Sequence, residues 1–281
     1  MINAYYNGEF LNFSDVRIPL TDRGVFFGDG IYDAAIGKAG RIYLEGEHLD
    51  RFYCNAKKLN IPFNMKRSSL AKLLHRLIKL SGYEEYFIYF QLTRYSKERC
   101  HAFDDTSLSN LLITIKKYSL PDFEKPLKLI TENDIRYGMC DVKTLNLLPA
   151  VLASKKAINM GCDEAIFIRD GKITECAHSN ISIIKNGTLL THPRGPHILP
   201  GITRKRVLYM CEKLSIPYRE ISFSRKELID ADAVLVTSTT KFCLSADIID
   251  GEKVGKAGDI TSKRLISAMK NDFFDSWEKE C

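Results

Sequence analysis

Hydrophobic residues recur along the chain with two spacings, which predict helices and strands in alternation. Leu49, Phe52, Ala56 and Leu59 lie three or four residues apart and predict an amphipathic helix over about 48–60. The same spacing predicts further helices at about 70–78 and 203–214. Stretches rich in aromatic and β-branched residues predict strands at 31–36, 41–43, 86–93, 111–115, 127–131, 164–168, 173–175, 181–184, 188–190 and 233–237.

Turn-forming pairs separate several of the predicted strands. Asn7-Gly8, Asp170-Gly171 and Asn186-Gly187 each stand between two apolar segments and are typical of tight hairpin turns. A longer turn-prone stretch, 119–126, contains two prolines and three charged residues and indicates a domain boundary. We therefore predict an α+β protein of two domains, 1–120 and 121–281, of which the second is richer in sheet.

A lone lysine, Lys143, stands between apolar residues just before another predicted helix. Asn146 can cap this helix, Pro149 is tolerated in its first turn and Gly161 can end it, while one face is shared by Leu148, Val151 and Leu152. We expect neighbours to hold Lys143 and to shield it partly from water. Desolvation would lower the pKa of the lysine and make it a nucleophile that forms Schiff bases. The alternative is an ordinary solvated cation.

Two segments have the character of anion sites. Leu199-Pro200-Gly201-Ile202-Thr203-Arg204 opens a helix, and exposed N–H groups at a helix N-terminus bind phosphate. Alternatively, Thr203 only caps the helix. Thr237-Ser238-Thr239-Thr240 follows a predicted buried strand with four hydroxyls, which can face a phosphate or form a turn.

Single polar residues elsewhere are further candidates. Arg51, near His48 at the start of the first helix, could bind a phosphate through two hydrogen bonds, or could be solvated. Arg99 and His101 are two apart in a segment that we expect to be extended, so both can meet one carboxylate. Tyr32 could add its hydroxyl to the same anion. Glu175 ends a predicted strand, where an ordinary salt bridge is the alternative to a ligand contact.

Composition and charge limit the class of protein. The chain has 281 residues, 45% hydrophobic and 27% charged, with a net charge of +6 and no long run of one sign. This mild positive charge suits anionic ligands as easily as nucleic acid. The eight cysteines form no CxxC pair, so we predict no metal site. The first residues read as a strand and turn and no apolar run is long enough to span a bilayer, so we expect a cytoplasmic protein with reduced thiols and no membrane partner.

Taken together and in order, the segments resemble the fold-type IV pyridoxal-5′-phosphate (PLP) aminotransferases, and most closely the bacterial D-amino-acid (D-alanine) aminotransferases. The resemblance covers nearly the whole chain. It is carried by Asp22-Arg23-Gly24, Phe27-Gly28-Asp29-Gly30-Ile31-Tyr32, His48-Leu49-Asp50-Arg51, Ile88 to Arg94, Arg99-Cys100-His101, Lys143-Thr144-Leu145-Asn146, Thr174-Glu175 with Ser179-Asn180, Leu199 to Arg204, and Thr237 to Thr240.

The resemblance implies a small N-terminal α/β domain and a larger β-barrel-like α+β domain that carries the PLP lysine. Lys143 matches the Schiff-base lysine, and Glu175 matches the partner of the pyridine nitrogen. Tyr32, Arg99 and His101 match the group that binds the substrate α-carboxylate. The other residues that match the cofactor site are Arg51, Asn180, Leu199, Gly201, Ile202, Thr203, Ser238 and Thr239.

The resemblance also implies the reaction: a D-amino acid such as D-alanine gives its amino group to 2-oxoglutarate, yielding pyruvate and D-glutamate. It further implies a homodimer in which Arg99 and His101 serve the partner subunit's active site. The Arg-x-His pair separates the D-specific enzymes from the branched-chain aminotransferases and from the aminodeoxychorismate lyases, which resemble this chain at the lysine and phosphate segments. The rival function on the same fold is that of a branched-chain L-amino-acid aminotransferase or an (R)-amine transaminase. A remote alternative is a non-catalytic binder of phosphorylated ligands or RNA, although the sequence lacks the basic–aromatic surface that such a binder needs.

The sequence departs from the family's pattern in two places. Ala177 and His178 stand where the D-specific relatives carry small hydroxyl residues before the asparagine. The run Lys241-Phe242-Cys243-Leu244-Ser245-Ala246 replaces a stretch that usually contains glutamate and proline. His178 could approach the phosphate or the edge of the cofactor ring, and the sequence leaves this choice open. The second departure concerns the size of the side-chain pocket, so the sequence also leaves the preferred amino acid open.

Overall fold

The computed structural model of the chain describes residues 1–104, 108–256 and 259–278. It contains two compact units: Met1–Leu120 with Val142–Asn146, and Pro121–Asp141 with Leu147–Cys281. The sequence analysis assigned Lys143 to the domain 121–281, whereas the segment around it packs with the first unit. The reason is local, because this segment hydrogen-bonds to the backbone at the beginning of strand β3.

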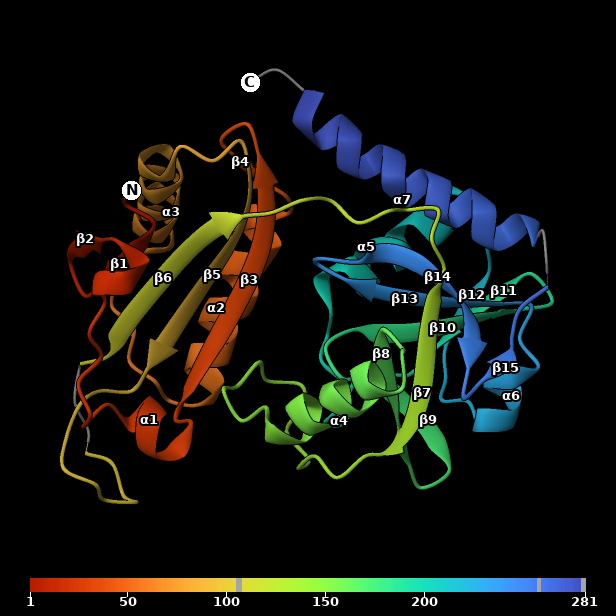
Figure 1. Ribbon diagram of the computed structural model, residues 1–281, viewed down its shortest axis with the longest axis horizontal. Coiled ribbons are helices and arrows are strands. Elements are labelled where there is room, and N and C mark those ends of the chain that lie inside the picture. The colour runs from red at the N-terminus through yellow and green to blue at the C-terminus, as the bar shows by residue number, and fades with distance from the viewer. Residues whose placement is uncertain (105–107, 257–258, 279–281) are drawn as a thin grey trace. The chain divides into compact units, whose positions relative to one another are not determined.

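The first unit is an antiparallel sheet of six strands in the order β2-β1-β6-β5-β3-β4 (Figure 1). Helices α2 and α3 pack on the sheet, and their apolar residues form one core with inward-facing residues such as Ile88 and Phe90. The elements are β1 (Ala4–Tyr6), β2 (Glu9–Leu11), the short 3₁₀ helix Phe13–Asp15, α1 (Arg23–Phe27), β3 (Gly30–Lys38), β4 (Arg41–Ile42), α2 (Glu45–Lys58), α3 (Arg67–Ser81), β5 (Glu85–Thr93) and β6 (Asn110–Lys117).

The second unit contains a mixed sheet in the order β12-β11-β10-β13-β14-β7-β8-β9, with β15 paired to β14. The sheet curls, so that β9 lies beside β10. Its elements are β7 (Leu127–Asn133), α4 (Leu148–Asn159), β8 (Glu164–Arg169), β9 (Lys172–Cys176), β10 (Asn180–Lys185), β11 (Thr188–Thr191), α5 (Ile202–Lys213), β12 (Tyr218–Glu220), α6 (Arg225–Ile229), β13 (Ala233–Ser238), β14 (Phe242–Ile249), β15 (Glu252–Lys253) and α7 (Ile260–Glu278).

The predicted turns and most predicted elements are confirmed. Asn7 and Gly8, Asp170 and Gly171, and Asn186 and Gly187 all have positive φ, as two-residue hairpin turns require. The sequence analysis missed α7, although Leu265, Met269 and Phe273 recur every four residues and are buried on it. The α+β prediction is therefore correct.

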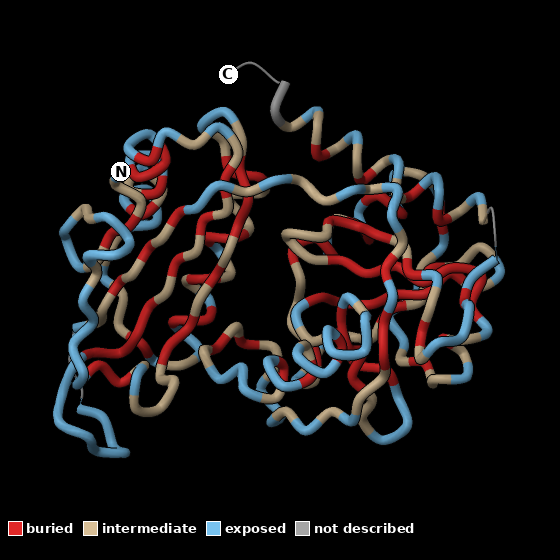
Figure 2. Tube along the Cα trace, in the orientation of Figure 1, coloured by how far each residue is buried: buried red, intermediate tan, exposed pale blue. Residues whose placement is uncertain are grey.

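Helix α4 differs from its prediction at its start. Asn146 does not cap it: the N-cap residue is Leu147, which has no side-chain capping bond, and the Asn146 Nδ2 donates to the backbone oxygen of Gly28. The strands of both units are mostly buried in Figure 2, but much of α4 is exposed. Only small residues, Ala150, Ala153 and Ala157, are buried on it, while Leu148, Val151 and Leu152 are exposed.

Candidate active site

Lys143 is placed by backbone pairing with strand β3. The backbone N–H of Tyr32 donates to the oxygen of Lys143 at 2.9 Å, and Thr144 forms an isolated bridge with Ile31. The Lys143 Nζ lies 4.2 Å from the centre of the Tyr32 ring. Within the described parts of the chain this ring is the only recorded partner of the amine, which has no hydrogen bond or ion pair there. The lysine is partly shielded from water, as expected, and its amine is left available for chemistry.

Arg51 lies against a buried carboxylate of the same unit. Its Nε and Nη2 donate to the two oxygens of Asp33, each at 2.8 Å, and the Nδ1 of His48 lies 2.8 Å from the same carboxylate. Burial opposes ionisation of Asp33, but Arg51 and His48 outweigh it and hold the pKa of this carboxyl well below its usual value. Arg51 is therefore a fixed cation rather than a solvated one, with only 10% of its side chain exposed.

Arg99 and His101 are brought together on one aromatic ring. The Cζ of Arg99 lies 5.1 Å from the centre of the Phe27 ring, and the His101 ring centre lies 5.3 Å from it. The sequence predicts an extended segment here, but in the structure the backbone bends at both residues. Both side chains are exposed nonetheless, and their shared contact gives the pair a common location in the first unit.

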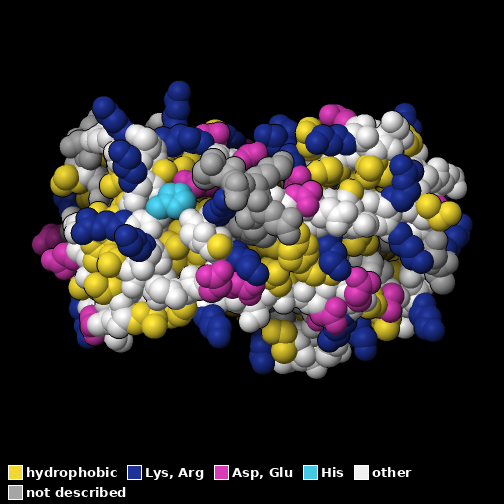
Figure 3. All heavy atoms as spheres, turned by 90° about the horizontal axis from the view of Figure 1, so that it is seen from above, with side chains coloured by type: hydrophobic (Ala, Val, Ile, Leu, Met, Phe, Trp, Pro, Cys, Tyr) yellow, Lys and Arg dark blue, Asp and Glu magenta, His cyan; other side chains and the backbone are white. Residues whose placement is uncertain are grey.

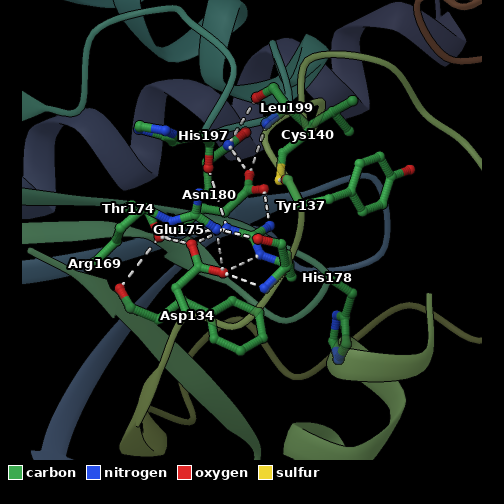
Figure 4. Close-up of polar contacts among 12 residues, drawn as sticks. Asp134, Tyr137, Cys140, Arg169, Thr174, Glu175, His178, Asn180, His197 and Leu199 are labelled. Carbon is green, nitrogen blue, oxygen red and sulfur yellow. Dashed lines mark hydrogen bonds and ion pairs between the residues drawn. The ribbon is translucent and has the colours of Figure 1, made fainter. Parts of the chain in front are cut away.

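Glu175 is the centre of the polar cluster of the second unit (Figure 4). One carboxylate oxygen accepts from the Nδ2 of Asn180 at 2.9 Å and from the backbone N–H of Leu199 at 3.0 Å. The other accepts from the Nη1 of Arg136 at 2.5 Å. Because Glu175 is 5% exposed, these donors replace the water that an ionised carboxylate needs.

Arg136 is the residue that the sequence analysis missed in this cluster. Its Nε and Nη2 donate to the two oxygens of Asp134, each at 2.9 Å, and Nη2 also reaches the backbone oxygen of His197 at 3.1 Å. Burial disfavours the guanidinium, but Asp134 and Glu175 outweigh burial and raise the pKa of Arg136. No local spacing indicates this role, because Arg136 and Glu175 are 39 residues apart.

The N-terminus of α5 has the form of an anion site. The N-cap residue is Gly201, not Thr203, and no side chain caps the helix, which excludes the alternative in which Thr203 only caps it. A Cβ at Gly201 would lie 1.9 Å from the Oδ1 of Asn180, so the close approach requires glycine. Asn180 also donates to the backbone oxygen of Leu199 at 2.9 Å. These contacts hold the segment before α5 so that the first helical N–H groups can meet an anion.

The hydroxyl run Thr237 to Thr240, which begins in the last two residues of β13, has an orphaned polar atom. The Oγ1 of Thr237 is buried without a hydrogen-bond partner among the described residues, and Thr237 is paired in the sheet with Asn180. Next to it, the Oγ of Ser238 accepts from the backbone N–H of Lys241 at 3.1 Å. Ser238 and Thr239 are only partly buried, so this turn presents hydroxyls beside the Asn180 strand. The uncapped N-terminus of α5, the close approach of Gly201 to Asn180 and the Thr237 hydroxyl without a partner among the described residues all fit a phosphorylated cofactor.

The two departures from the family's pattern meet on one buried carboxylate. Glu164 accepts from the backbone N–H of His178 at 2.7 Å and from the Oγ of Ser179 at 2.9 Å. It also forms an ion pair with Lys241. The ring of His178 is half exposed and points away from the Glu175 cluster in Figure 4. Lys241 and His178 therefore join two turns of the second unit through Glu164.

Other kinds of site find no support within residues 1–104, 108–256 and 259–278. No group of three or more His, Cys, Asp or Glu residues there could hold a metal ion. No described helix is both long and apolar enough to cross a membrane. On the face shown in Figure 3, Lys and Arg side chains are interspersed with Asp and Glu side chains instead of forming one basic patch.

Comparison with known proteins identifies the family. The model of the family "Amino-transferase class IV" matches residues 30–249. A D-alanine aminotransferase of Staphylococcus epidermidis is 36% identical over 266 residues, which are 93% of this chain and 94% of that protein. A D-alanine aminotransferase of Bacillus licheniformis is 33% identical over 287 residues, 99% of each chain.

A solved structure shares the fold at lower identity. The Escherichia coli branched-chain amino acid aminotransferase superposes with a TM-score of 0.88 at 21% identity, over 98% of this chain and 94% of that one. The fold-type IV prediction is thereby confirmed. The chain belongs to the class IV amino-transferases and is a PLP-dependent transaminase that acts on amino acids and 2-oxo acids.

Proposed function

We propose that this transaminase moves the amino group of D-alanine and other D-amino acids to 2-oxoglutarate, giving pyruvate and D-glutamate. The observation that carries the proposal is the pair Arg99 and His101, exposed side by side on Phe27. Relatives that are 33–36% identical over nearly the whole chain are named D-alanine aminotransferases, which supports the same choice. The branched-chain enzyme shares 21% identity and so supports the fold alone.

In this proposal Lys143 is the catalytic residue of the first unit. Bound PLP supplies an aldehyde that captures amino groups and a ring that withdraws electrons. The Lys143 amine would hold the cofactor covalently between turnovers. Once released, it would take the proton from the substrate Cα and deliver it to the cofactor carbon that carried the aldehyde. The amine lies over the Tyr32 ring and has no hydrogen bond or ion pair among the described residues, so it can change partners without breaking an ion pair.

The remaining contacts orient the cofactor. Glu175 would hold the proton of the pyridine nitrogen, because a carboxylate fixed by three donors stays ionised. The backbone N–H groups of Ile202 and Thr203 would bind the phosphate at the start of α5. Arg51, Ser238 and Thr239 would complete the phosphate contacts, while Asn180, Leu199 and Gly201 would shape the site around Glu175.

Arg99, His101 and Tyr32 would recognise the substrate α-carboxylate. A guanidinium and an imidazolium form strong charge-assisted hydrogen bonds with a carboxylate. Fixing the carboxylate also fixes the enantiomer, because only one then directs its Cα–H at the lysine.

A direct test compares enantiomers with 2-oxoglutarate as acceptor. Turnover is expected with D-alanine, with release of pyruvate measured by a coupled assay, and not with L-alanine or L-leucine. Preference for L-leucine would identify a branched-chain enzyme, and preference for a simple chiral amine would identify an amine transaminase. Purified protein without a cofactor absorbance, but with salt-sensitive RNA binding, would contradict both readings.

We also propose that the enzyme is a homodimer, in which Arg99 and His101 act at the partner subunit's cofactor. The exposed apolar residues of α4, Leu148, Val151 and Leu152, support a partner surface, since monomers rarely expose adjacent large apolar side chains. Sedimentation of Leu152→Glu should show a shift from dimer to monomer. Ile260→Glu, on an equally apolar and 73% exposed residue of α7, is the control and should remain dimeric. A wild-type monomer would contradict the proposal.

A further inference from the structure

We propose that Arg23 is a positioning residue for substrate recognition: it holds the backbone of the segment that carries Arg99 and His101 and so sets where their side chains lie. The inference rests on the proposed function, because it matters only if this pair binds the substrate carboxylate. Arg23 begins α1 and is 4% exposed, so it does not itself meet a substrate.

The guanidinium of Arg23 reaches the segment directly. Its Nη1 donates to the backbone oxygen of Cys100 at 2.6 Å, and its Nη2 donates to that of His101 at 3.1 Å. The residues from Ser96 to Asp104 are exposed and belong to no helix or strand. Other contacts hold the ends of the segment: the backbone N–H of Lys97 donates to the oxygen of Thr21, and that of Asp104 donates to the Tyr95 hydroxyl. The two charge-assisted hydrogen bonds to consecutive carbonyls are therefore a large part of what fixes its middle.

Arg23 is itself fixed from the opposite side. Its Nε donates to Asp29 at 2.8 Å, and the same carboxylate accepts from the Nε of Arg94 at 2.9 Å. Arg94 donates onward to the backbone oxygens of Leu59 and Asn60, at 2.8 and 2.7 Å. Burial opposes ionisation of Asp29, but Arg94 and Arg23 lower its pKa below the usual value, so the carboxylate stays charged between them. Through Arg23, Asp29 and Arg94, the segment is thus connected to the residues that follow the C-terminal end of α2.

The side chains share one platform. The Cζ of Arg23 lies 4.8 Å from the Phe27 ring centre, on the ring that Arg99 and His101 also contact. Asp29 directly precedes β3, the strand that carries Tyr32 and pairs with Lys143. Arg23 therefore connects the carboxylate-binding pair, which serves the partner subunit's cofactor in the proposed dimer, to the start of β3 in its own subunit.

Lysine could not replace Arg23 in this role. A guanidinium offers a planar fork that binds two carbonyls and a carboxylate at once, whereas an ammonium is a point charge. Arg23→Lys keeps the charge and loses the fork, and Arg23→Gln loses both. Asp29→Asn keeps the Arg23 guanidinium but removes the charged carboxylate that holds it. This variant therefore tests the same idea without changing Arg23.

The test uses the full-length, PLP-loaded enzyme. For Arg23→Gln and Arg23→Lys we expect KM for D-alanine to rise about tenfold with kcat changed less than about threefold, since two charge-assisted hydrogen bonds are lost. Activity toward a chiral amine without a carboxylate should stay unchanged. Arg206→Gln removes an arginine ion pair with Asp272 in the second unit and should change none of these readings.

A double-mutant cycle separates the inference from the proposed function. In a background of Arg99→Ala with His101→Ala, Arg23→Gln should raise KM no further, because its effect passes through those side chains. If the double Arg99/His101 variant leaves KM for D-alanine unchanged, the proposed function and the inference both fail. If that variant raises KM while Arg23 and Asp29 variants do not, or if kcat and the chiral amine are affected equally, only the positioning role of Arg23 is overturned.

Discussion

Glu175 in the second unit accepts hydrogen bonds from Arg136, Asn180 and the backbone of Leu199, whereas the Lys143 amine in the first unit lies over the Tyr32 ring and has no hydrogen bond or ion pair among the described residues. The difference corresponds to the different roles of the two residues in the proposed reaction. A group that holds a charge in place benefits from saturated, rigid contacts, which cost no reorganisation during the reaction. A group that forms and breaks bonds must be able to exchange partners. The two residues should therefore respond differently to substitution.

The largest effect is expected for Lys143→Ala. Turnover should fall by about 10⁴-fold, because both the covalent attachment of the cofactor and the proton transfer are lost. Thermal stability should hardly change, since no ion pair is removed. Steady-state kinetics and calorimetry measure the two effects. Peptide mass analysis after borohydride treatment of the wild type should find the cofactor on Lys143, and a fully active alanine variant would refute its role.

A smaller loss of turnover is expected for Glu175→Gln. The glutamine amide cannot accept at both ends, so at least one of the three donors loses its acceptor. A neutral amide also holds the proton of the pyridine nitrogen less well than a carboxylate, so turnover should fall by about 10- to 100-fold. Unlike Lys143→Ala, this change should also lower the free energy of unfolding by about 1–3 kcal/mol, as measured in urea. If the glutamine variant were as stable as the wild type while Lys143→Ala unfolded, the contrast between the two residues would be reversed.

The smallest effect is expected for Gly201→Ala, which perturbs the second unit without removing a polar group. The new Cβ would overlap the Oδ1 of Asn180 and force this side chain to shift. We expect the dissociation constant for PLP to rise about fivefold, equivalent to about 1 kcal/mol of lost binding free energy, as measured by fluorescence titration. Gly195→Ala is the matched control, since nothing lies within 4 Å of a Cβ at that position. Equal effects of both variants would show that the close approach to Asn180 is unimportant.

Local patterns in the sequence predicted most of the fold. Positive-φ turns such as Asn7-Gly8, and strands with alternating or continuous apolar residues, depend on nearest neighbours and could be identified directly. The orientation of α4 could not, because alanines rather than leucines pack on the sheet. Asn146 looked like a cap from its position alone, but Gly28, distant in sequence, offers it a better-placed carbonyl.

The candidate site shows the same division. The start of α5 was predictable, because glycine followed by a helix is a local signal with a physical meaning. Arg136 and Arg23 were not, since the contact of Arg136 with Glu175 spans 39 residues and that of Arg23 with Cys100 spans 77. The sequence likewise does not indicate that Lys241 and His178 share a buried partner. The contact forms only because β8 places Glu164 between their turns.

The chain enters the first unit twice, through Met1–Leu120 and again through Val142–Asn146. A break in the chain after Leu120 would therefore separate two parts of the same unit. The fragment 1–120 would lose the segment that pairs with β3, and the fragment 121–281 would carry Lys143 without the strand that positions it. Fragments expressed apart should therefore need each other for activity.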